Sequence, residues 1–472
     1  MDGDDGFPPT AGSRATSPGR SVRGTTAGGR TVNRDAARAR NRRRWLGWGL
    51  LVTGFVLVSL HRSSTAVLSG ELMAAFDTTG TSLGLLHSSF FYLYAAFQLP
   101  AGLLTDRFGA RAIAAGGTGV MSVGALGFGL AETFGVAFAS RLLVGLGASV
   151  LFVAVLRFCA NWFRPDEFGT MTGVTFAAGI VGGLAATTPL ALAVSAVGWR
   201  ATLIGLGAFG LLVTVGIALL SHDTPEKAGH EPLADVPDRP EVTAGDLKRH
   251  TVDALRSPET WLLGVVLFLM VGAGITIAGL WAIPFLVQSY GISVTEASVY
   301  LLVGNVGGMI GPTAFGWLSD RLGRRTELIV LSATAFGLTW GIFAVFGTIP
   351  LLLVAVVFLF SRVLGGGIPL AFAVMRERHP PGASGTVIGL VNTASWVGAA
   401  VFPVVMGAAL DAYWTGETVN GTRVYTLTGY RVAFGIALVA GLVAAACALA
   451  LHYRIRGDRK PAESAEVGAE AD

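Results

Sequence analysis

Charged residues are scarce in this chain of 472 residues: 14% are Asp, Glu, Lys or Arg, whereas 52% are hydrophobic. A soluble protein carries about 25% charged residues, so the composition argues against a soluble fold. The two cysteines, Cys159 and Cys447, both lie in apolar runs and exclude a disulfide framework and a cysteine-based metal site. No Walker-type phosphate-binding sequence occurs, which excludes ATP as the energy source.

The stretches between the clustered charges are long enough to cross a membrane. A helix needs roughly 20 apolar residues to span the hydrocarbon core. The stretches predict twelve transmembrane helices, at 45–69, 82–104, 112–131, 134–161, 169–194, 200–221, 260–288, 296–315, 326–346, 349–376, 385–411 and 429–453. The 65 glycines fit this interpretation, because small residues let helices approach closely in lipid.

Polar segments divide the chain into parts. Residues 1–44 hold ten Arg and four Asp without an apolar run, which predicts a disordered basic tail. Residues 222–257 hold eight acidic and five basic residues and several prolines, which predicts a linker with a weak signal for an amphipathic helix near 244–255. We expect a six-helix bundle at 45–221, a second at 258–453, and a C-terminal tail at 454–472.

Positive charge is concentrated in alternate connections. The arginines at the end of the N-terminal tail are followed by others after the second, fourth, eighth, tenth and twelfth spans. Connections rich in Lys and Arg stay in the cytoplasm. We therefore expect both termini and the linker to be cytoplasmic, in a multi-pass protein of the plasma membrane.

One charged pattern, G-x-x-x-D-R-x-G-x-R, occurs twice, at 102–111 and at 316–325, each time between two apolar runs. Further matched pairs are Pro165 and Pro381, Gly169 and Gly385, and Arg141 and Arg362. Matched landmarks in the same order indicate two pseudo-symmetric halves. Among membrane proteins this is the architecture of a secondary transporter.

The repeated pattern resembles the signature that the major facilitator superfamily carries between spans 2 and 3 and, more weakly, between spans 8 and 9. Arg141–Gly147 resembles the span-4 motif of that superfamily, and the resemblance covers 45–453. It implies an all-α membrane fold of twelve transmembrane helices in two pseudo-symmetric six-helix bundles. Residues 60–64 and 90–102 resemble the organic-anion branches, including the sugar-phosphate permeases.

The same resemblance implies a gate at the two charged turns. Each Asp would pair with Arg, or cap a neighbouring helix, in one conformation and release it in the other. The gating residues implied are Gly102, Asp106, Arg107, Gly109, Arg111, Gly316, Asp320, Arg321, Gly323 and Arg325. The alternative is a static charged turn that only fixes the topology.

Two departures from the family pattern bear on coupling and on cargo. The position next to the span-1 arginine, often acidic in anion–cation symporters, is His61, and Ala148 replaces a carboxylate after the span-4 arginine. The usual form of proton coupling is therefore not expected. The Gly-Pro pair of drug antiporters is absent from span 5, which argues against that class.

Arginine is the charged residue that lies inside the predicted spans. Arg62, Arg141 and Arg362 fall well within spans 1, 4 and 10, and no Asp or Glu falls in the middle of any span. An unpaired arginine in lipid costs at least ~2.5–3.5 kcal/mol, so these groups must face a cavity or a partner. A guanidinium binds carboxylate or phosphate bidentately, which predicts an anionic substrate. The alternative is hydrogen bonding to backbone carbonyls or water.

Uncharged polar residues inside the spans are further candidates for the substrate site. His61 can load and release a proton near neutral pH, although an isolated histidine is more often structural. Asn305 and Asn392 must find hydrogen-bond partners, in a ligand or in another helix. The predicted substrate-contact residues are Arg62, Arg141, Arg362, His61, Asn305 and Asn392.

These observations predict a secondary active transporter that moves a small solute, most readily an organic anion, by alternating access. We expect a monomer in the lipid bilayer that is driven by an ion or substrate gradient, with a proton or a sodium ion as the candidate coupling ion. No enzymatic activity, cofactor, metal site or nucleic-acid partner is expected. The alternatives are a transporter-like solute sensor, and a drug–proton antiporter for neutral or cationic compounds.

Overall fold

The computed structural model describes residues 27–231, 244–379 and 381–469. The chain divides into two units, Met1–Arg42 and Arg43–Asp472. Residues 27–42 of the first unit are the beginning of a helix, and the predicted disorder of residues 1–26 lies outside the described residues. The second unit holds the helical bundle and the cavities.

The first half of the bundle is helical. Its helices are α1 (Ala27–Ser63), α2 (Thr65–Phe76), α3 (Gly80–Ala96), α4 (Gln98–Phe108), α5 (Ala110–Gly129), α6 (Phe134–Ser149), α7 (Leu151–Trp162), α8 (Pro165–Ala185), α9 (Thr188–Val197) and α10 (Trp199–Leu220). The helix η1 (Glu226–Ala228) and α11 (Ala244–Arg256) follow. Helix α11 coincides with the weakly predicted helix in the linker, and α1 begins at Ala27 instead of at residue 45.

The second half repeats this plan and adds a short β-ribbon. Its elements are α12 (Pro258–Thr276), η2 (Ile277–Trp281), α13 (Ala282–Tyr290), α14 (Val294–Leu322), α15 (Arg325–Phe346), α16 (Leu351–Leu364), η3 (Gly365–Gly367), α17 (Leu370–Arg378), α18 (Pro381–Asp411), β1 (Trp414–Val419), β2 (Thr422–Tyr425) and α19 (Leu427–Ala469). Strands β1 and β2 are antiparallel. Helix α19 continues well beyond the predicted end of its span at residue 453.

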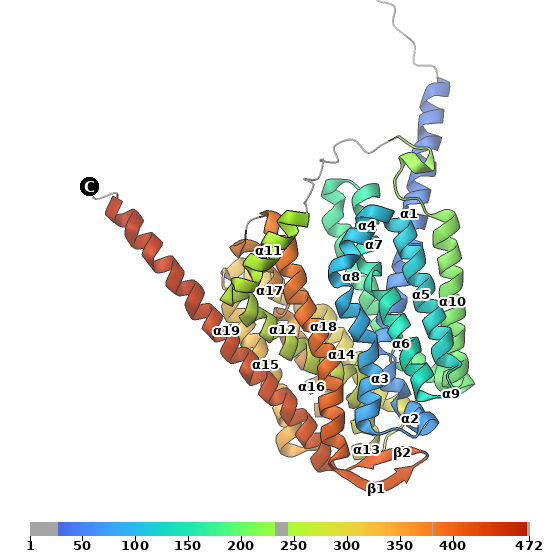
Figure 1. Ribbon diagram of the computed structural model, residues 1–472, viewed down its shortest axis with the longest axis vertical. Coiled ribbons are helices and arrows are strands. Elements are labelled where there is room, and N and C mark those ends of the chain that lie inside the picture. The colour runs from blue at the N-terminus through green and yellow to red at the C-terminus, as the bar shows by residue number, and fades with distance from the viewer. Residues whose placement is uncertain (1–26, 232–243, 380, 470–472) are drawn as a thin grey trace, which may run out of the picture. The chain divides into compact units, whose positions relative to one another are not determined.

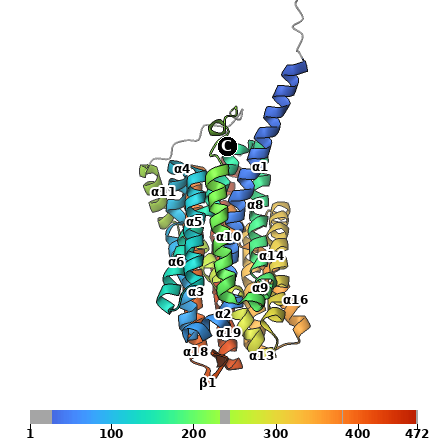
Figure 2. The same ribbon diagram turned by 90° about the vertical axis from the view of Figure 1, so that its right-hand side faces the viewer.

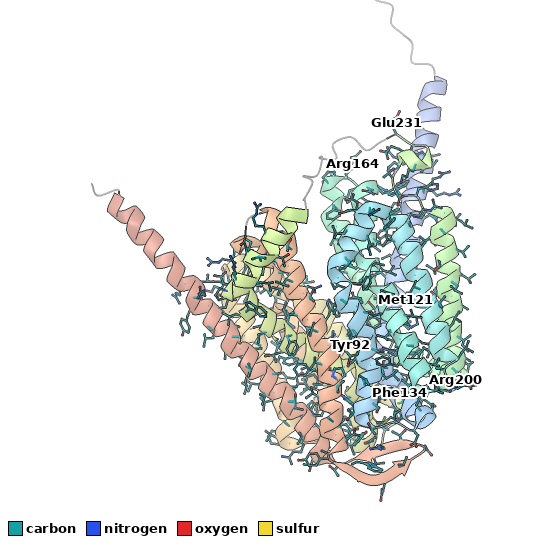
Figure 3. All side chains as sticks on the ribbon, in the orientation of Figure 1. Tyr92, Met121, Phe134, Arg164, Arg200 and Glu231 are labelled. Carbon is teal, nitrogen blue, oxygen red and sulfur yellow. The ribbon has the colours of Figure 1, made fainter. Side chains whose placement is uncertain are left out.

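The two ends of the bundle are distinguished by different connections. Figure 1 shows β1 and β2 at one end, with α4, α7 and α11 at the other, and Figure 2 agrees. We call the first the ribbon end, after β1 and β2. We call the second the hairpin end, after the charged turns between paired helices that the repeated pattern forms. In the first half, Arg164 lies toward the hairpin end and Arg200 toward the ribbon end, with Met121 between them (Figure 3). Charged ends and an apolar middle are what a bilayer requires.

Eleven helices in the described part of the chain are long and apolar enough to cross a membrane. The span predicted at 82–104 is divided into α3 and α4. The division lies just before Pro100, which has no N–H to donate within the helix. Backbone hydrogen bonds nevertheless continue through the division, from Phe97 N to Leu93 O (3.0 Å) and from Ala101 N to Phe97 O (2.9 Å). Helices α3 and α4 together therefore supply the twelfth span.

Four other spans are interrupted at related positions in the repeat. The first is divided at Ser64, the fourth at Val150, the seventh by the π-helical segment η2 and the tenth by the 3₁₀ segment η3. Discontinuous helices of this kind form the substrate sites of secondary transporters near the middle of the bilayer. Single π turns inside helices are also common at functional positions.

The halves make close backbone contact where α3 crosses α18 near the ribbon end. A Cβ atom on Gly84 would lie 2.6 Å from the carbonyl carbon of Pro403, closer than real side chains come. A Cβ atom on Gly407 would likewise lie 2.6 Å from the carbonyl carbon of Gly80. Glycine is therefore required at this crossing, which joins the first half to the second.

Candidate functional site

Three of the predicted substrate-contact residues line one cavity between the halves. Arg62 comes from the end of α1, Asn305 from α14 and Arg362 from the end of α16. The volume of this cavity is about 280 Å³. The rest of its wall is formed by Ser63, Thr187, Val271, Ile275, Ala278, Gly279, Leu301 and Trp396. We call it the arginine cavity.

Arg62 is half-buried and lies against the opposite half of the protein. Its guanidinium carbon is 5.6 Å from the ring centroid of Trp396 on α18, within the range of a cation–π contact. Its Nη2 donates a long hydrogen bond of 3.5 Å to Ser59 Oγ. Both partners are neutral, so they orient the guanidinium group without cancelling its charge.

Arg362 lies along a glycine-rich face of α14. A Cβ atom on Gly308 would be 3.7 Å from Arg362 Nε, and one on Gly304 would be 3.7 Å from Arg362 Cγ. Small residues at these positions give the arginine side chain its room. Among the described residues, the buried Nε atom has no hydrogen-bond partner. The side chain is also close enough to Arg62 for the two charges to repel each other.

The positive charge of the arginine cavity is not balanced by the described part of the protein. No described carboxylate forms an ion pair with Arg62 or Arg362. Two like charges in a region of low dielectric constant raise the free energy of the empty cavity. An anion between the guanidinium groups would remove this repulsion and accept their unused hydrogen bonds.

Asn305 connects the halves at the cavity wall. Its Nδ2 donates a hydrogen bond of 3.4 Å to the backbone oxygen of Gly183 on α8. At this length the bond is weak, and the amide oxygen can still accept a hydrogen bond from a bound solute. The structure thus gives Asn305 one partner in another helix and places its side chain in the wall of the cavity.

Arg141 does not line the arginine cavity, although its position in the repeat matches that of Arg362. Its side chain is 1% exposed, and its guanidinium carbon lies 5.3 Å from the ring centroid of Phe128. Within the described residues, its Nε and one Nη atom have no hydrogen-bond partner. The structure therefore places Arg141 inside the first half, packed under an aromatic ring.

His61 and Asn392 are also absent from the wall of the arginine cavity. His61 is 3% exposed, and its backbone oxygen accepts a hydrogen bond from Ser64 Oγ at 3.0 Å. Asn392 donates to Gln98 Oε1 at 3.3 Å, which joins α18 to α4 across the two halves. The Asn392 amide is thus engaged in contact between the halves in this conformation.

A second cavity of about 240 Å³ adjoins the first inside the second half. The two share Val271, Ile275, Ala278, Leu301, Asn305 and Arg362 as lining residues. The remainder of the second wall is mostly apolar and includes Met270, Phe336, Trp340, Phe358 and Ile368. We call it the apolar cavity.

In the first half, the repeated pattern is tied to its own bundle. Asp106 forms an ion pair of 3.2 Å with Arg157 on α7. Arg111 donates from its backbone N to Asp223 Oδ1 (2.8 Å) and from Nε to the Ala218 oxygen (3.0 Å). Gly109 has φ +87°, a left-handed conformation that favours glycine. Arg107 packs its guanidinium group over its neighbour Phe108.

In the second half, Arg325 joins two carboxylates, Asp320 at 3.5 Å and Glu377 at 3.0 Å. Gly323 has φ +66° and ends α14 with a hydrogen bond from its N to the Ser319 oxygen. Arg321 lies over its neighbour Trp317. Gly102 and Gly316, one in each half, have open space where a side chain would lie. These two glycines make no close helix contact in this conformation.

Asp411, at the C-terminus of α18, joins the two halves at the ribbon end. Its carboxylate accepts hydrogen bonds from Gly80 N (2.8 Å), Thr81 N (2.8 Å) and Thr81 Oγ1 (2.6 Å) at the beginning of α3. An acid at a helix C-terminus is unfavourable for its own helix, whereas the N-terminus of α3 stabilises it. Tyr425 Oη also donates to Asp411 at 3.3 Å. Burial and this neighbouring carboxylate raise the pKa of the Tyr425 phenol, which stays protonated.

The β-ribbon adds further contacts between the halves at the same end. Thr422 Oγ1 donates to the Gly70 oxygen on α2 at 3.1 Å. Gln288 on α13 donates to the Arg423 oxygen and accepts from Tyr425 N, both at 3.0 Å. The β-ribbon thus forms hydrogen bonds with both halves.

A bundle of two pseudo-symmetric helical halves, with a cavity between them and breaks in the helices around it, defines a membrane transport protein. The chain belongs to the Major Facilitator Superfamily, whose sequence model matches residues 50–403 and 269–471. The family and fold predicted from the repeated pattern are therefore confirmed.

Individual relatives and structures resemble the chain over most of its length. It is 25% identical over 380 residues to the probable sulfoacetate transporter SauU of Cupriavidus necator, covering 77% of this chain and 86% of the relative. It is 27% identical over 389 residues to the membrane sensor protein UhpC of Salmonella typhimurium, covering 77% and 85%. The solved structure of a bacterial homologue of the human lysosomal transporter Spinster matches with a TM-score of 0.70 at 18% identity, covering 87% of this chain and 97% of the other.

Sequence reasoning missed two features of the site. The first is Trp340, which lies in an apolar predicted span and has no local pattern that marks it. Its signal is the indole N–H, which needs a hydrogen-bond acceptor in such a span. Asp411 lies at the end of a predicted span and is the second feature. Its signal was an acid at a helix C-terminus, where the helix dipole disfavours negative charge.

Proposed function

We propose that this protein is a secondary active transporter of the plasma membrane that carries a small organic anion by alternating access. One observation carries the proposal: Arg62 and Arg362 come from opposite halves and line one cavity without a described carboxylate partner. A carboxylate, sulfonate or phosphate has the charge and the geometry that two guanidinium groups bind. The name of the relative SauU, a probable sulfoacetate transporter, supports this class of cargo.

The two arginines also couple anion binding to movement of the halves. Without an anion, their repulsion opposes closure of the cavity around them. A bound anion attracts both groups, so the halves can rock about the site with the charge enclosed. Asn305 and Asn392 form bonds between the halves that would break and re-form during this motion.

Alternating access requires the two ends to exchange roles. Asp411 joins the halves at the ribbon end in this conformation, and we assign the hairpin end to the cytoplasm. When the hairpin end closes, Asp106 and Asp320 would leave Arg157 and Arg325 and hold the opposite half. Gly102 and Gly316, which have open space beside them now, would then meet that half.

Coupling to an ion gradient is the remaining part of the proposal. A proton or sodium ion moving down its gradient would drive accumulation of the anion. His61, buried and next to Arg62 in sequence, is our candidate proton carrier, because an imidazole can take up and release a proton.

A transporter-like sensor is the second candidate function. It is favoured by the relative UhpC of Salmonella typhimurium, which is named a membrane sensor protein. A sensor binds its solute in the same cavity but need not carry it across. Accumulation of a radiolabelled anion inside proteoliposomes supports a transporter, whereas saturable binding without accumulation supports a sensor.

The class of solute can be tested by thermal unfolding of the purified protein. We expect small carboxylates, sulfonates or phosphates to raise the unfolding midpoint by several degrees, because a ligand at 100 times its Kd stabilises the folded state by ~2.7 kcal/mol. Neutral sugars and amines should leave the midpoint unchanged. Arg362→Ala should lose the anion effect.

The matched control for that experiment is Arg456→Ala, which removes an exposed arginine in the C-terminal part of α19. It should keep the full stabilisation by anions. Stabilisation by amines alone, or equal stabilisation by anions in Arg362→Ala, would show that the arginine cavity does not bind an anion.

A further inference from the structure

The apolar cavity beside Arg362 has no role in holding a compact anion. It shares Arg362 and Asn305 with the arginine cavity and continues from them toward α15. Separately, cavities of about 280 and about 240 Å³ are smaller than the ~300–1,000 Å³ of an ordinary ligand site, whereas together they fall within that range. The contiguous space thus has a charged part and an apolar part.

The walls of the apolar cavity are unsuited to a polyhydroxylated solute. Met270, Phe336, Trp340, Phe358 and Ile368 offer carbon surface and aromatic rings. The hydroxyl of Ser361, also in the wall, already donates to the Phe358 oxygen at 2.9 Å. Each hydroxyl group of a sugar acid placed here would lose its hydrogen bonds to water without replacement.

Besides Arg362 Nε, a second buried polar atom of a residue in this wall lacks a partner among the described residues. Trp340 is 3% exposed, and among the described residues its indole Nε1 has no hydrogen-bond acceptor. Its ring is stacked on Phe434 at a centroid distance of 5.7 Å and an interplanar angle of 5°, with Phe358 edge-on at 5.7 Å. The ring is therefore held in place in the wall of the cavity, and its buried N–H has no acceptor among the described residues.

Comparison of the two halves shows that this space is not a by-product of the repeat. The matching arginine of the first half, Arg141, is covered by the ring of Phe128 at 5.3 Å. The second half has open volume beside Arg362 instead, next to the unpartnered N–H of Trp340. The two matched arginines therefore have different surroundings, as expected for a pocket shaped to an asymmetric solute.

We propose that the cargo is an amphipathic anion, with an acidic head between Arg62 and Arg362 and an apolar body, such as an aromatic ring, in the cavity formed by Met270, Phe336, Trp340 and Phe358. An acceptor atom on the far side of that body receives the Trp340 N–H. This assignment rests on the proposed function, because it needs the head to bind at the arginines. It separates this protein from a carrier of compact or sugar-derived acids.

The test compares anions that differ only in the body they carry, by thermal shift and competition binding on the full-length protein. The probes are benzoate, acetate, sulfoacetate and glucuronate, with benzamide as the neutral form of the first. We expect benzoate to bind at least about tenfold more tightly than the other three anions, since burial of even one methylene in a fitted pocket changes affinity about tenfold or more. Benzamide should not bind.

The indole N–H is tested by a matched pair of ligands, 4-methoxybenzoate and 4-ethylbenzoate, which differ by one acceptor oxygen. Trp340→Phe keeps a ring and removes the donor. It should weaken 4-methoxybenzoate about three- to tenfold, the value of one hydrogen bond, and leave 4-ethylbenzoate unchanged. Ile368→Trp places a larger side chain in the apolar cavity and is an independent test. It should weaken the binding of benzoate at least about tenfold and leave the binding of acetate unchanged.

The outcomes separate this inference from the function on which it rests. If acetate, sulfoacetate or glucuronate binds as tightly as benzoate, and Trp340→Phe and Ile368→Trp change nothing, the apolar body is refuted while the anion transporter stands. If no anion binds, or if benzamide binds as well as benzoate, both the inference and the proposed function fail. If benzoate binds more tightly than the other anions and Ile368→Trp abolishes this difference, the inference is supported even where Trp340→Phe does not fold.

Discussion

Replacing Arg62 by alanine is expected to reduce anion uptake about 100-fold or more. Hydrogen bonds to a charged group contribute ~1.5–3 kcal/mol each, and a bidentate guanidinium makes two of them. The loss is large because Arg362 alone cannot enclose the charge from both halves. The measurement is initial uptake of radiolabelled benzoate or sulfoacetate, whichever gives the larger thermal shift, into proteoliposomes.

Arg62→Lys provides the graded comparison. Lysine keeps the positive charge but loses the planar, bidentate geometry, so uptake should fall about tenfold and not to background. Arg456→Ala should transport normally, because the Arg456 side chain is exposed in the C-terminal part of α19. Uptake in Arg62→Ala at the wild-type rate would mean that this guanidinium group does not contact the cargo.

Removing the Asp411 carboxylate is expected to open the ribbon end. In Asp411→Ala, the N-terminus of α3 loses the acceptor for Gly80 N, Thr81 N and Thr81 Oγ1. A net loss of ~2 kcal/mol from these charged hydrogen bonds would shift the ratio of ribbon-closed to ribbon-open protein about 30-fold. The shift can be measured as a distance distribution between spin labels at Glu71 on α2 and Val294 on α14.

Labels at these two exposed positions report on opposite halves, and the native cysteines Cys159 and Cys447 are replaced by serine in the background. Asp411→Ala should move population from the short distance to a longer one. Thr81→Val removes a single bond to the carboxylate and should shift the ratio less. Glu132→Ala, an exposed acid between α5 and α6, is the matched control. An unchanged distribution in Asp411→Ala would show that this carboxylate does not hold the end closed.

The spans and the family were predictable because they depend on strong local signals. A run of roughly 20 apolar residues has few alternatives to a membrane helix, and the repeated pattern supplies the internal symmetry. The interruptions at Ser64, Val150 and η2 were not predictable. Hydropathy measures the transfer of side chains to lipid, and a break in backbone hydrogen bonding within an apolar segment leaves it unchanged.

The arginines show where sequence reasoning about the site ends. Symmetry of the repeat makes Arg141 and Arg362 equivalent, and the sequence gives no reason to separate them. The structure distinguishes them by what packs nearby: a ring of Phe128 covers Arg141, whereas glycines of α14 leave room around Arg362. That difference depends on contacts between helices, which no local pattern reports.

Trp396 and Trp340 illustrate the same limit from the aromatic side. Both are tryptophans in apolar spans, where an aromatic residue most often fills the core. In the folded chain, Trp396 lies against Arg62 and Trp340 lines the apolar cavity. Their roles follow from which helix each one faces, which the period of a single helix does not determine.

The central claim is that two arginines from opposite halves hold the negative charge of the cargo. It is tested most directly by equilibrium binding of benzoate and benzamide to the purified wild-type protein and to the Arg62→Ala, Arg362→Ala and Arg456→Ala variants. We predict that the wild type and Arg456→Ala bind benzoate and not benzamide, and that each cavity variant loses benzoate binding by about 100-fold. Equal binding of the acid and its amide, or undiminished binding of benzoate by both cavity variants, would contradict the claim.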